Sequence, residues 1–235
     1  MTALPFTTRP AGLLLDAGDT LIFFDGAAMA AALRDQGETC EPARLEASLH
    51  AAKRRYQQGL LKGASHEDGW SILVHELLTQ SRFASERARE LLPALRRVHD
   101  DFYFWRRVPE GLVAALERAR AAGMRIGVIS NSEGKLRSVF ERVGLMPYLD
   151  LVVDSHLEGV QKPDPEIFRR ALLRLELAPS RAIYAGDIPE VDVLGARGAG
   201  MEGVVVDAFG DYEGTDWPRV RSVEELIDKL LALPR

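Results

Sequence analysis

Four short segments of the chain carry residue types that could do chemistry together. They are LLLDAGDTL around Asp16, IGVISNSEG around Ser130, GVQKPDPEIF around Lys162, and YAGDIPEVDVLGARGAGM around Asp187 and Asp192. A carboxylate can attack phosphorus and form an acyl phosphate, which divides one difficult step into two easier ones. Asp16 is our candidate for that attack. Each segment alone is a weak signal, since a carboxylate after a strand often only caps the next helix.

A carboxylate that attacks an anion needs positive charge beside it. Mg²⁺ usually takes one or two carboxylates, several waters and the substrate phosphate, and Asp16 and Asp187 are the candidate ligands. Lys162 would offset the negative charge on Asp16 and on the phosphoryl group. Ser130 and backbone N–H groups near Asn131 would hold phosphoryl oxygens.

The elements that must position these residues follow from the apolar pattern. Short apolar runs alternate with helical patterns, as expected for strands buried on both faces of a parallel sheet. The runs cover residues 12–15, 124–129, 149–153, 182–185 and 203–206. We therefore predict an α/β fold with a doubly wound parallel sheet, which places its chemistry at the carboxyl ends of the strands. Asp16, Ser130 with Asn131, and Gly186 with Asp187 each follow one of these runs.

Three helix starts can be proposed from capping residues. Pro109 is placed to lie in the first turn of one helix. Asp164 is the expected N-cap of another, with Pro165 at its first position. Ser222 and Glu225 have the spacing of a capping box at the start of the last helix.

Residues 25–108 differ from the rest, because they contain helical patterns and no convincing strand. We interpret them as a helical module inserted between the first two core strands, so that residues 1–24 and 109–235 form the α/β core. The helical patterns cover residues 42–61, 66–80 and 85–101.

Composition narrows the function further. The net charge is -5 and the pI about 5.6, so a chain-wide basic surface for nucleic acid is not expected. Cys40 is the only cysteine, which excludes an intrachain disulfide and suits a reducing compartment. No run approaches the ~20 apolar residues of a membrane span, and MTALPFTTRP lacks a signal-peptide pattern. We expect a cytoplasmic protein with no membrane partner. No heptad or interface stripe indicates its oligomeric state.

The order of the four segments resembles the haloacid dehalogenase superfamily over nearly the whole chain. Residues 25–108 resemble the C1 helical cap that such proteins carry between the first two core strands. The family's four motifs match, in order, at Asp16 and Thr20, at Ser130 and Asn131, at Lys162 with Pro163 and Asp164, and at Gly186 with Asp187 and Asp192.

The resemblance implies a Mg²⁺-dependent phosphohydrolase of small phosphorylated metabolites, with Asp16 as the covalent nucleophile and a Rossmann-like core. It adds the backbone carbonyl of Gly18 to the metal ligands and places Asp192 in or next to the metal shell. Thr20 would order the first loop at the substrate side.

The chain departs from the family pattern at Gly18. Family phosphatases usually carry a second Asp there as general acid and base, a contribution typically worth ~10²–10⁴ in rate. Asp19, the next residue, could replace it from a shifted backbone, or a residue of the helical module could supply the acid. Alternatively, Asp19 is only a loop or N-cap carboxylate, and the enzyme is slow or acts on good leaving groups.

Two other functions stay open. The protein could bind phosphate with little or no turnover, which Gly18 favours. Family dehalogenases also lack the second Asp and need no metal, but they tend to have Ser or Asn where this chain has Gly186 and Asp187. The Asp187 and Asp192 pair therefore favours phosphoryl chemistry.

Overall fold

The computed structural model of the protein describes residues 6–61 and 66–234. The chain divides into two compact units. One consists of the described residues up to Phe23 together with those from Val108 onward, and the other is Phe24–Arg107.

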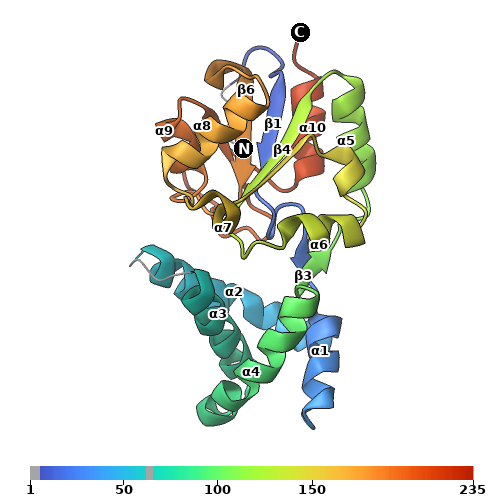
Figure 1. Ribbon diagram of the computed structural model, residues 1–235, viewed down its shortest axis with the longest axis vertical. Coiled ribbons are helices and arrows are strands. Elements are labelled where there is room, and N and C mark those ends of the chain that lie inside the picture. The colour runs from blue at the N-terminus through green and yellow to red at the C-terminus, as the bar shows by residue number, and fades with distance from the viewer. Residues whose placement is uncertain (1–5, 62–65, 235) are drawn as a thin grey trace. The chain divides into compact units, whose positions relative to one another are not determined.

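The first unit is built on a sheet of six parallel strands in the order β5-β4-β1-β6-β7-β8 (Figure 1). The strands are β1 (Gly12–Leu15), β4 (Arg125–Ser130), β5 (Leu151–Asp154), β6 (Ala182–Gly186), β7 (Glu202–Val206) and β8 (Arg219–Val220). All five predicted strands are confirmed, with ends that move by up to two residues. β8 was not foreseen, because two residues are too short to show a hydrophobic pattern.

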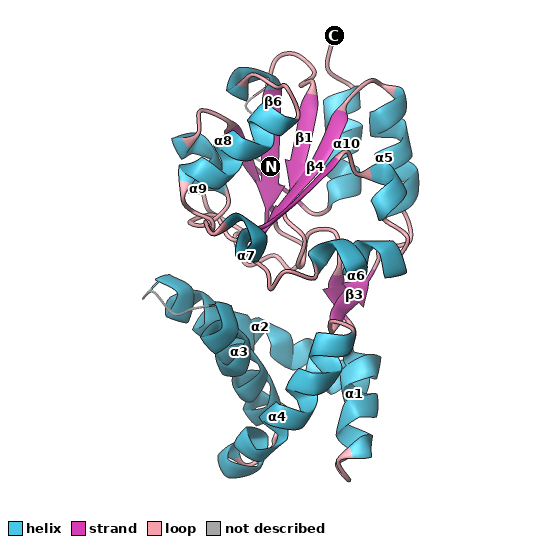
Figure 2. Cartoon of the chain, viewed as in Figure 1, coloured by secondary structure: helices cyan, strands magenta, loops and turns pink. Residues whose placement is uncertain are grey.

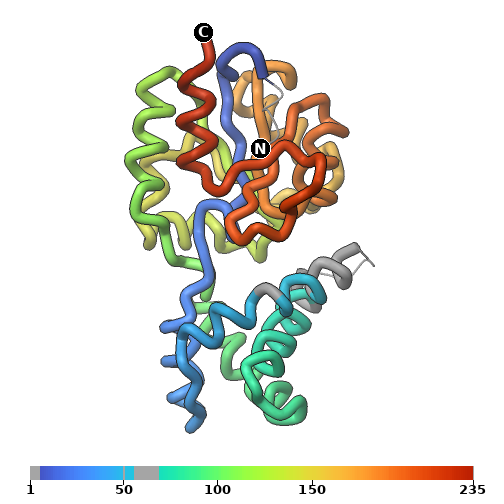
Figure 3. Tube along the Cα trace, turned by 180° about the vertical axis from the view of Figure 1, so that it is seen from behind, coloured from blue at the N-terminus to red at the C-terminus, as the bar shows by residue number. Residues whose placement is uncertain are grey.

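Helices cover both faces of this sheet, which makes it doubly wound as predicted (Figure 2). On one face lie α8 (Pro165–Arg174) and α9 (Val193–Gly198), which pack on each other and against the strands. On the other face lie α5 (Leu112–Ala121) and α10 (Val223–Leu231), side by side (Figure 3). Two shorter helices, α6 (Leu136–Arg142) and α7 (Ser155–Glu158), follow β4 and β5.

Two of the three predicted helix starts are confirmed. The Asp164 side chain accepts a backbone N–H in the first turn of α8, which Pro165 opens. Ser222 Oγ accepts from the N–H of Glu225 at 3.2 Å at the start of α10. The Glu225 carboxylate accepts from the N–H of Arg221 at 2.6 Å, so the second half of the capping box reaches back one residue further than expected.

The expectation that Pro109 lies in the first turn of a helix is wrong. The helix α5 begins at Leu112 with Gly111 as its N-cap. The N–H of Leu112 donates to the carbonyl of Pro109 at 3.2 Å, so the proline belongs to the turn that leads into the helix.

The second unit contains α1 (Gly26–Asp35), α2 (Pro42–Leu61), α3 (His66–Gln80) and α4 (Ser85–Asp101). The last three confirm the predicted helices. The expectation that residues 25–108 contain no strand is wrong, since β3 (Trp105–Arg107) lies among them and pairs with β2 (Phe23–Phe24) in a two-stranded sheet. Its strands of two and three residues are too short to produce a recognisable alternation. Among the helices of residues 6–61 and 66–234, none is both long and apolar enough to cross a membrane.

Candidate active site

The polar residues at the strand ends meet at one edge of the parallel sheet. Leu15 pairs with Val128 of β4 and with Ala185 of β6, so these three strands end side by side. Asp16 follows β1 directly and its N–H donates to the carbonyl of Ala185 at 2.8 Å. Ser130 is the last residue of β4 and is buried.

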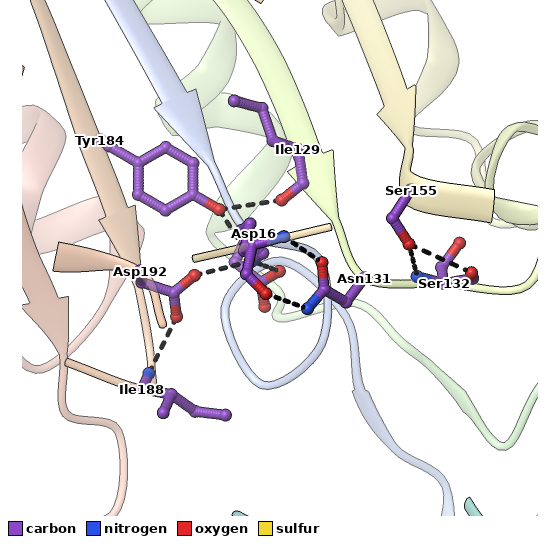
Figure 4. Close-up of polar contacts among 9 residues, drawn as sticks. Asp16, Ile129, Asn131, Ser132, Ser155, Tyr184, Ile188 and Asp192 are labelled. Carbon is purple, nitrogen blue, oxygen red and sulfur yellow. Dashed lines mark hydrogen bonds and ion pairs between the residues drawn. The ribbon is translucent and has the colours of Figure 1, made fainter. Parts of the chain in front are cut away.

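Lys162, in the loop before α8, extends its ammonium group into this edge. Lys162 Nζ lies 2.6 Å from Asp16 Oδ1, 2.6 Å from Asp192 Oδ1 and 2.9 Å from the hydroxyl oxygen of Tyr184 (Figure 4). The Lys162 side chain is only 3% exposed. An ammonium has three N–H donors and no acceptor, so all three donors are accepted by the protein.

Burial and charge set the protonation of this cluster. Burial raises the pKa of Asp16 to about 7, the Lys162 ammonium opposes the rise, and the charges of Asp192 and Asp187 add to it. Burial also raises the pKa of Asp192. Burial disfavours the charge on Lys162, but the carboxylates of Asp16 and Asp192 outweigh that effect and raise its pKa. The lysine therefore stays positive, while ionised Asp16 carries a free-energy cost.

Asp192 is held on both of its carboxylate oxygens. Oδ1 accepts from Lys162, and Oδ2 accepts from the N–H of Ile188 at 2.9 Å (Figure 4). A Cβ at position 186 would collide with this carboxylate, which explains why the strand ends in Gly186. Asp192 thus fixes both the lysine and the loop that carries Asp187.

The Asn131 side chain links two of the four sequence segments. Its Nδ2 donates to the carbonyl of Lys162 at 2.9 Å, and the N–H of Lys162 donates to Asn131 Oδ1 at 2.8 Å. The next residue, Ser132, donates its N–H to Ser155 Oγ at 3.1 Å (Figure 4). The Asn131 amide therefore positions the lysine loop, which leaves the predicted phosphoryl contacts to Ser130 and to backbone groups.

A second buried carboxylate, Asp154 at the end of β5, organises the same edge. It accepts from Ser132 Oγ at 2.5 Å and from the N–H groups of Gly134 at 3.0 Å, Leu136 at 3.2 Å and His156 at 3.1 Å. These donors belong to the loop after β4 and to the first turns of α6 and α7. Asp154 was not predicted from the sequence, although it ends a strand of the parallel sheet, which is where functional residues are expected.

Tyr184 was missed as well. It lies inside the buried strand β6, and its hydroxyl both accepts from Lys162 and donates to the carbonyl of Ile129 at 2.8 Å. A tyrosine in a strand buried on both faces must satisfy its hydroxyl, and this was the available signal.

The loop after β1 places Gly18, Asp19 and Thr20 in a tight turn. Asp19 has a φ of 54°, a left-handed conformation that Asp tolerates, and is 2% exposed. The interpretation of Asp19 as a helix N-cap is wrong, because Asp25 caps α1. Thr20 is also 2% exposed, and its Oγ1 has no hydrogen-bond partner within the described part of the chain.

The donor set is suited to a divalent cation. Asp16, Asp187 and Asp192 interact electrostatically, and together with the one ammonium of Lys162 they give a formal charge of -3 + 1 = -2 when all are ionised. Within residues 6–61 and 66–234, no three His, Cys, Asp or Glu side chains are clustered as metal ligands. Mg²⁺ requires only one or two carboxylates besides water. Asp16, Asp187 and the Gly18 carbonyl are the residues that could hold it, with Asp192 in or next to the metal shell.

Comparison with known proteins gives consistent matches. The family model described as haloacid dehalogenase-like hydrolase matches residues 11–200. The human haloacid dehalogenase-like hydrolase domain-containing protein 3 is 31% identical over 205 residues, which is 83% of this chain and 80% of that protein. A phosphoserine phosphatase from Thermus thermophilus is 38% identical over 136 residues, but these are 57% of this chain and 53% of the phosphatase.

Among solved structures, the putative HAD-hydrolase YfnB from Bacillus subtilis, bound to magnesium, has a TM-score of 0.74 and 19% identity. The match covers 94% of this chain and 99% of that structure, and at this identity it shows a shared fold. The family model and the human relative each cover most of the chain, and the four sequence motifs meet at one edge of the sheet. The chain belongs to the haloacid dehalogenase-like hydrolase family.

Proposed function

We propose that this protein is a Mg²⁺-dependent phosphohydrolase of small phosphorylated metabolites that acts through an aspartyl phosphate on Asp16. The observation that carries the proposal is the buried pair of Asp16 and Lys162. Asp16 Oδ1 is held by the ammonium at 2.6 Å, and Oδ2 accepts no hydrogen bond from the described residues. One oxygen is therefore fixed and the other is available to attack phosphorus. The similarity to a phosphoserine phosphatase supports the same reaction class.

Each residue then has a defined task. Asp16 forms the acyl phosphate, which water hydrolyses in a second step. Lys162 lowers the pKa of Asp16 against the larger, opposite effect of burial and so favours the ionised form that attacks. Ser130 and the buried hydroxyl of Thr20 supply contacts to phosphoryl oxygens. Bound Mg²⁺ supplies positive charge for the phosphoryl group. Residues 25–108 act as a helical cap domain that determines which metabolite is accepted.

Release of nitrophenolate from 4-nitrophenyl phosphate tests this function. We expect turnover with Mg²⁺, none with chelator, and loss of turnover in Asp16→Asn. Asp164→Asn is the matched control, since it makes the same change at an exposed helix cap. Turnover that survives Asp16→Asn in a folded protein would refute a covalent role for Asp16.

The alternative function is phosphate binding with weak turnover, and Gly18 is the observation that favours it. If the missing acid limits the rate, Gly18→Asp should speed hydrolysis of alkyl phosphates, which are poor leaving groups, by about 10- to 100-fold. Nitrophenolate leaves without a proton, so its release should change little. An unchanged alkyl phosphate rate in a folded variant would exclude this explanation. Complete inactivity of the wild type on both esters would lead us to test haloacids.

A further inference from the structure

Tyr184 lies in the central strand β6, and its side chain is buried while its hydroxyl contacts the candidate site. Its ring is fully buried and packs edge-on against Phe168 of α8, with ring centroids 4.9 Å apart. Its hydroxyl reaches the end of β4 and the lysine at once. The ring therefore holds the hydroxyl at a fixed distance from two elements of the site.

The direction of each hydrogen bond follows from the groups involved. A backbone carbonyl can only accept, so the bond to Ile129 O uses the Tyr184 proton. An ammonium can only donate, so the bond with Lys162 Nζ uses a lone pair of the Tyr184 oxygen. Burial raises the pKa of Tyr184 and keeps the phenol protonated, which maintains both bonds.

The Tyr184 hydroxyl completes the hydrogen bonding of the Lys162 ammonium. Two of its protons go to the carboxylates of Asp16 and Asp192, and the third goes to a neutral oxygen. Without that oxygen, the third N–H would be buried and unsatisfied, and the ammonium would rotate or shift to find an acceptor. Such a movement would loosen its hold on Asp16 Oδ1 and with it the orientation of the free oxygen.

We propose that Tyr184 is a positioning residue that locks the Lys162 ammonium onto Asp16 Oδ1, so that Oδ2 faces the substrate. The proposal rests on the function proposed above for Asp16. Because Lys162 has no donor left for the substrate in this arrangement, the loss of the Tyr184 hydroxyl should affect turnover far more than substrate affinity.

Tyr184→Phe removes one oxygen and preserves the packing against Phe168. Tyr148→Phe is the matched control, since Tyr148 lies before β5 and thus at the opposite, amino edge of the sheet. With 4-nitrophenyl phosphate we expect kcat to fall about 10- to 100-fold in Tyr184→Phe, with KM changed less than about 3-fold. The control should keep both constants and both variants should keep the melting temperature within a few degrees.

A spectroscopic readout separates this inference from the proposed function. In protein with ¹⁵N-labelled lysine side chains, a buried, fully bonded ammonium should give a slowly exchanging ¹⁵N–¹H signal that Lys162→Met removes. Tyr184→Phe should shift this signal and speed its exchange. An unchanged signal would overturn the positioning role whatever the activity. A shifted signal with unchanged kcat, or a rise in KM alone, would also overturn it. A wild type that is inactive but has the shift refutes the phosphatase function and supports the lock.

Discussion

Two buried aspartates at strand ends on the same edge of the sheet, with β4 between their strands, differ in how the protein satisfies their carboxylates. Asp154 ends β5 and satisfies its carboxylate with four protein donors, three of them backbone N–H groups. Asp16 follows β1 and has one ammonium on Oδ1, while Oδ2 receives nothing from the described residues. Burial is nearly the same, at 4% exposure for Asp154 and 7% for Asp16.

The difference separates a carboxylate that builds the site from one that can react. A carboxylate surrounded by N–H donors has its lone pairs engaged and makes a poor nucleophile. A carboxylate with a raised pKa and an unengaged oxygen is poised to react with an electrophile or bind a cation. The reactivity of a carboxylate at this edge therefore depends on whether one of its oxygens receives no hydrogen bond from the protein.

The largest effect should come from removing the shared cation with Lys162→Met. This change leaves Asp16 and Asp192 buried without their ammonium, so we expect kcat to fall by about 10²–10³-fold and stability to fall by ~3–5 kcal/mol. Lys229→Met, at a partly exposed ion pair with Glu225, should cost under about 1 kcal/mol.

The Lys162→Met experiment has an internal check. Adding Asp16→Asn to Lys162→Met should restore part of the lost stability in urea unfolding, because one uncompensated charge is removed. If the double variant is less stable than Lys162→Met alone, uncompensated charge is not the cause of the loss.

The next effect should arise at the satisfied aspartate. Asp154→Asn places an NH₂ group against N–H donors, so we expect a loss of ~2–4 kcal/mol in urea unfolding. Asp164→Asn is the control, because Asn is as good an N-cap as Asp and the site is exposed. Equal, small losses at both positions would mean that the Asp154 cluster does not hold the loop after β4.

The apolar pattern of the sequence predicts some strands of the fold and not others. Strands buried on both faces are continuous apolar runs, so β1, β4, β5, β6 and β7 could be located within two residues. The strands β2, β3 and β8 have only two or three residues and carry no periodicity. Local pattern therefore predicts the central sheet and fails at its shortest elements.

The residues of the candidate site also fall into two groups, those that a local motif predicts and those that it does not. Asp16, Lys162 and Asp187 could be proposed because each occupies a motif with its own local spacing. The bond from Tyr184 to Ile129 joins residues 55 apart, and the amide pair of Asn131 with Lys162 joins residues 31 apart. Such partners depend on strand order and register, so their roles appear only once the sheet is assembled.

A smaller effect should appear in the pH dependence of stability. The pKa of Asp16 is raised from 3.8 to about 7 in the folded protein. The stability that protonated Asp16 contributes is therefore fully present below about pH 4 and is lost as the pH rises to about 7. Asp16→Asn does not ionise and should therefore melt about 2–8 °C above the wild type at pH 8 in chelator. The difference should vanish near pH 4. A constant difference from pH 4 to 8 would show that the Asp16 pKa is not raised.

The smallest effect on stability should come from removing a single hydroxyl group near each aspartate. Ser132 Oγ donates to Asp154 at 2.5 Å, whereas Thr20 Oγ1 lies in the loop after Asp16 and is buried with no partner among the described residues. Ser132→Ala should cost ~1–2 kcal/mol, since it removes one hydrogen bond to a buried carboxylate. Thr20→Val should be neutral or stabilise by up to ~1 kcal/mol, because it removes an unsatisfied group.

Thr20→Val should nevertheless raise KM for 4-nitrophenyl phosphate, since we assign this hydroxyl to the phosphoryl group. A stability loss in Thr20→Val equal to that of Ser132→Ala would mean that Thr20 holds the loop instead, and that the region around Asp16 is as fully bonded as the region around Asp154.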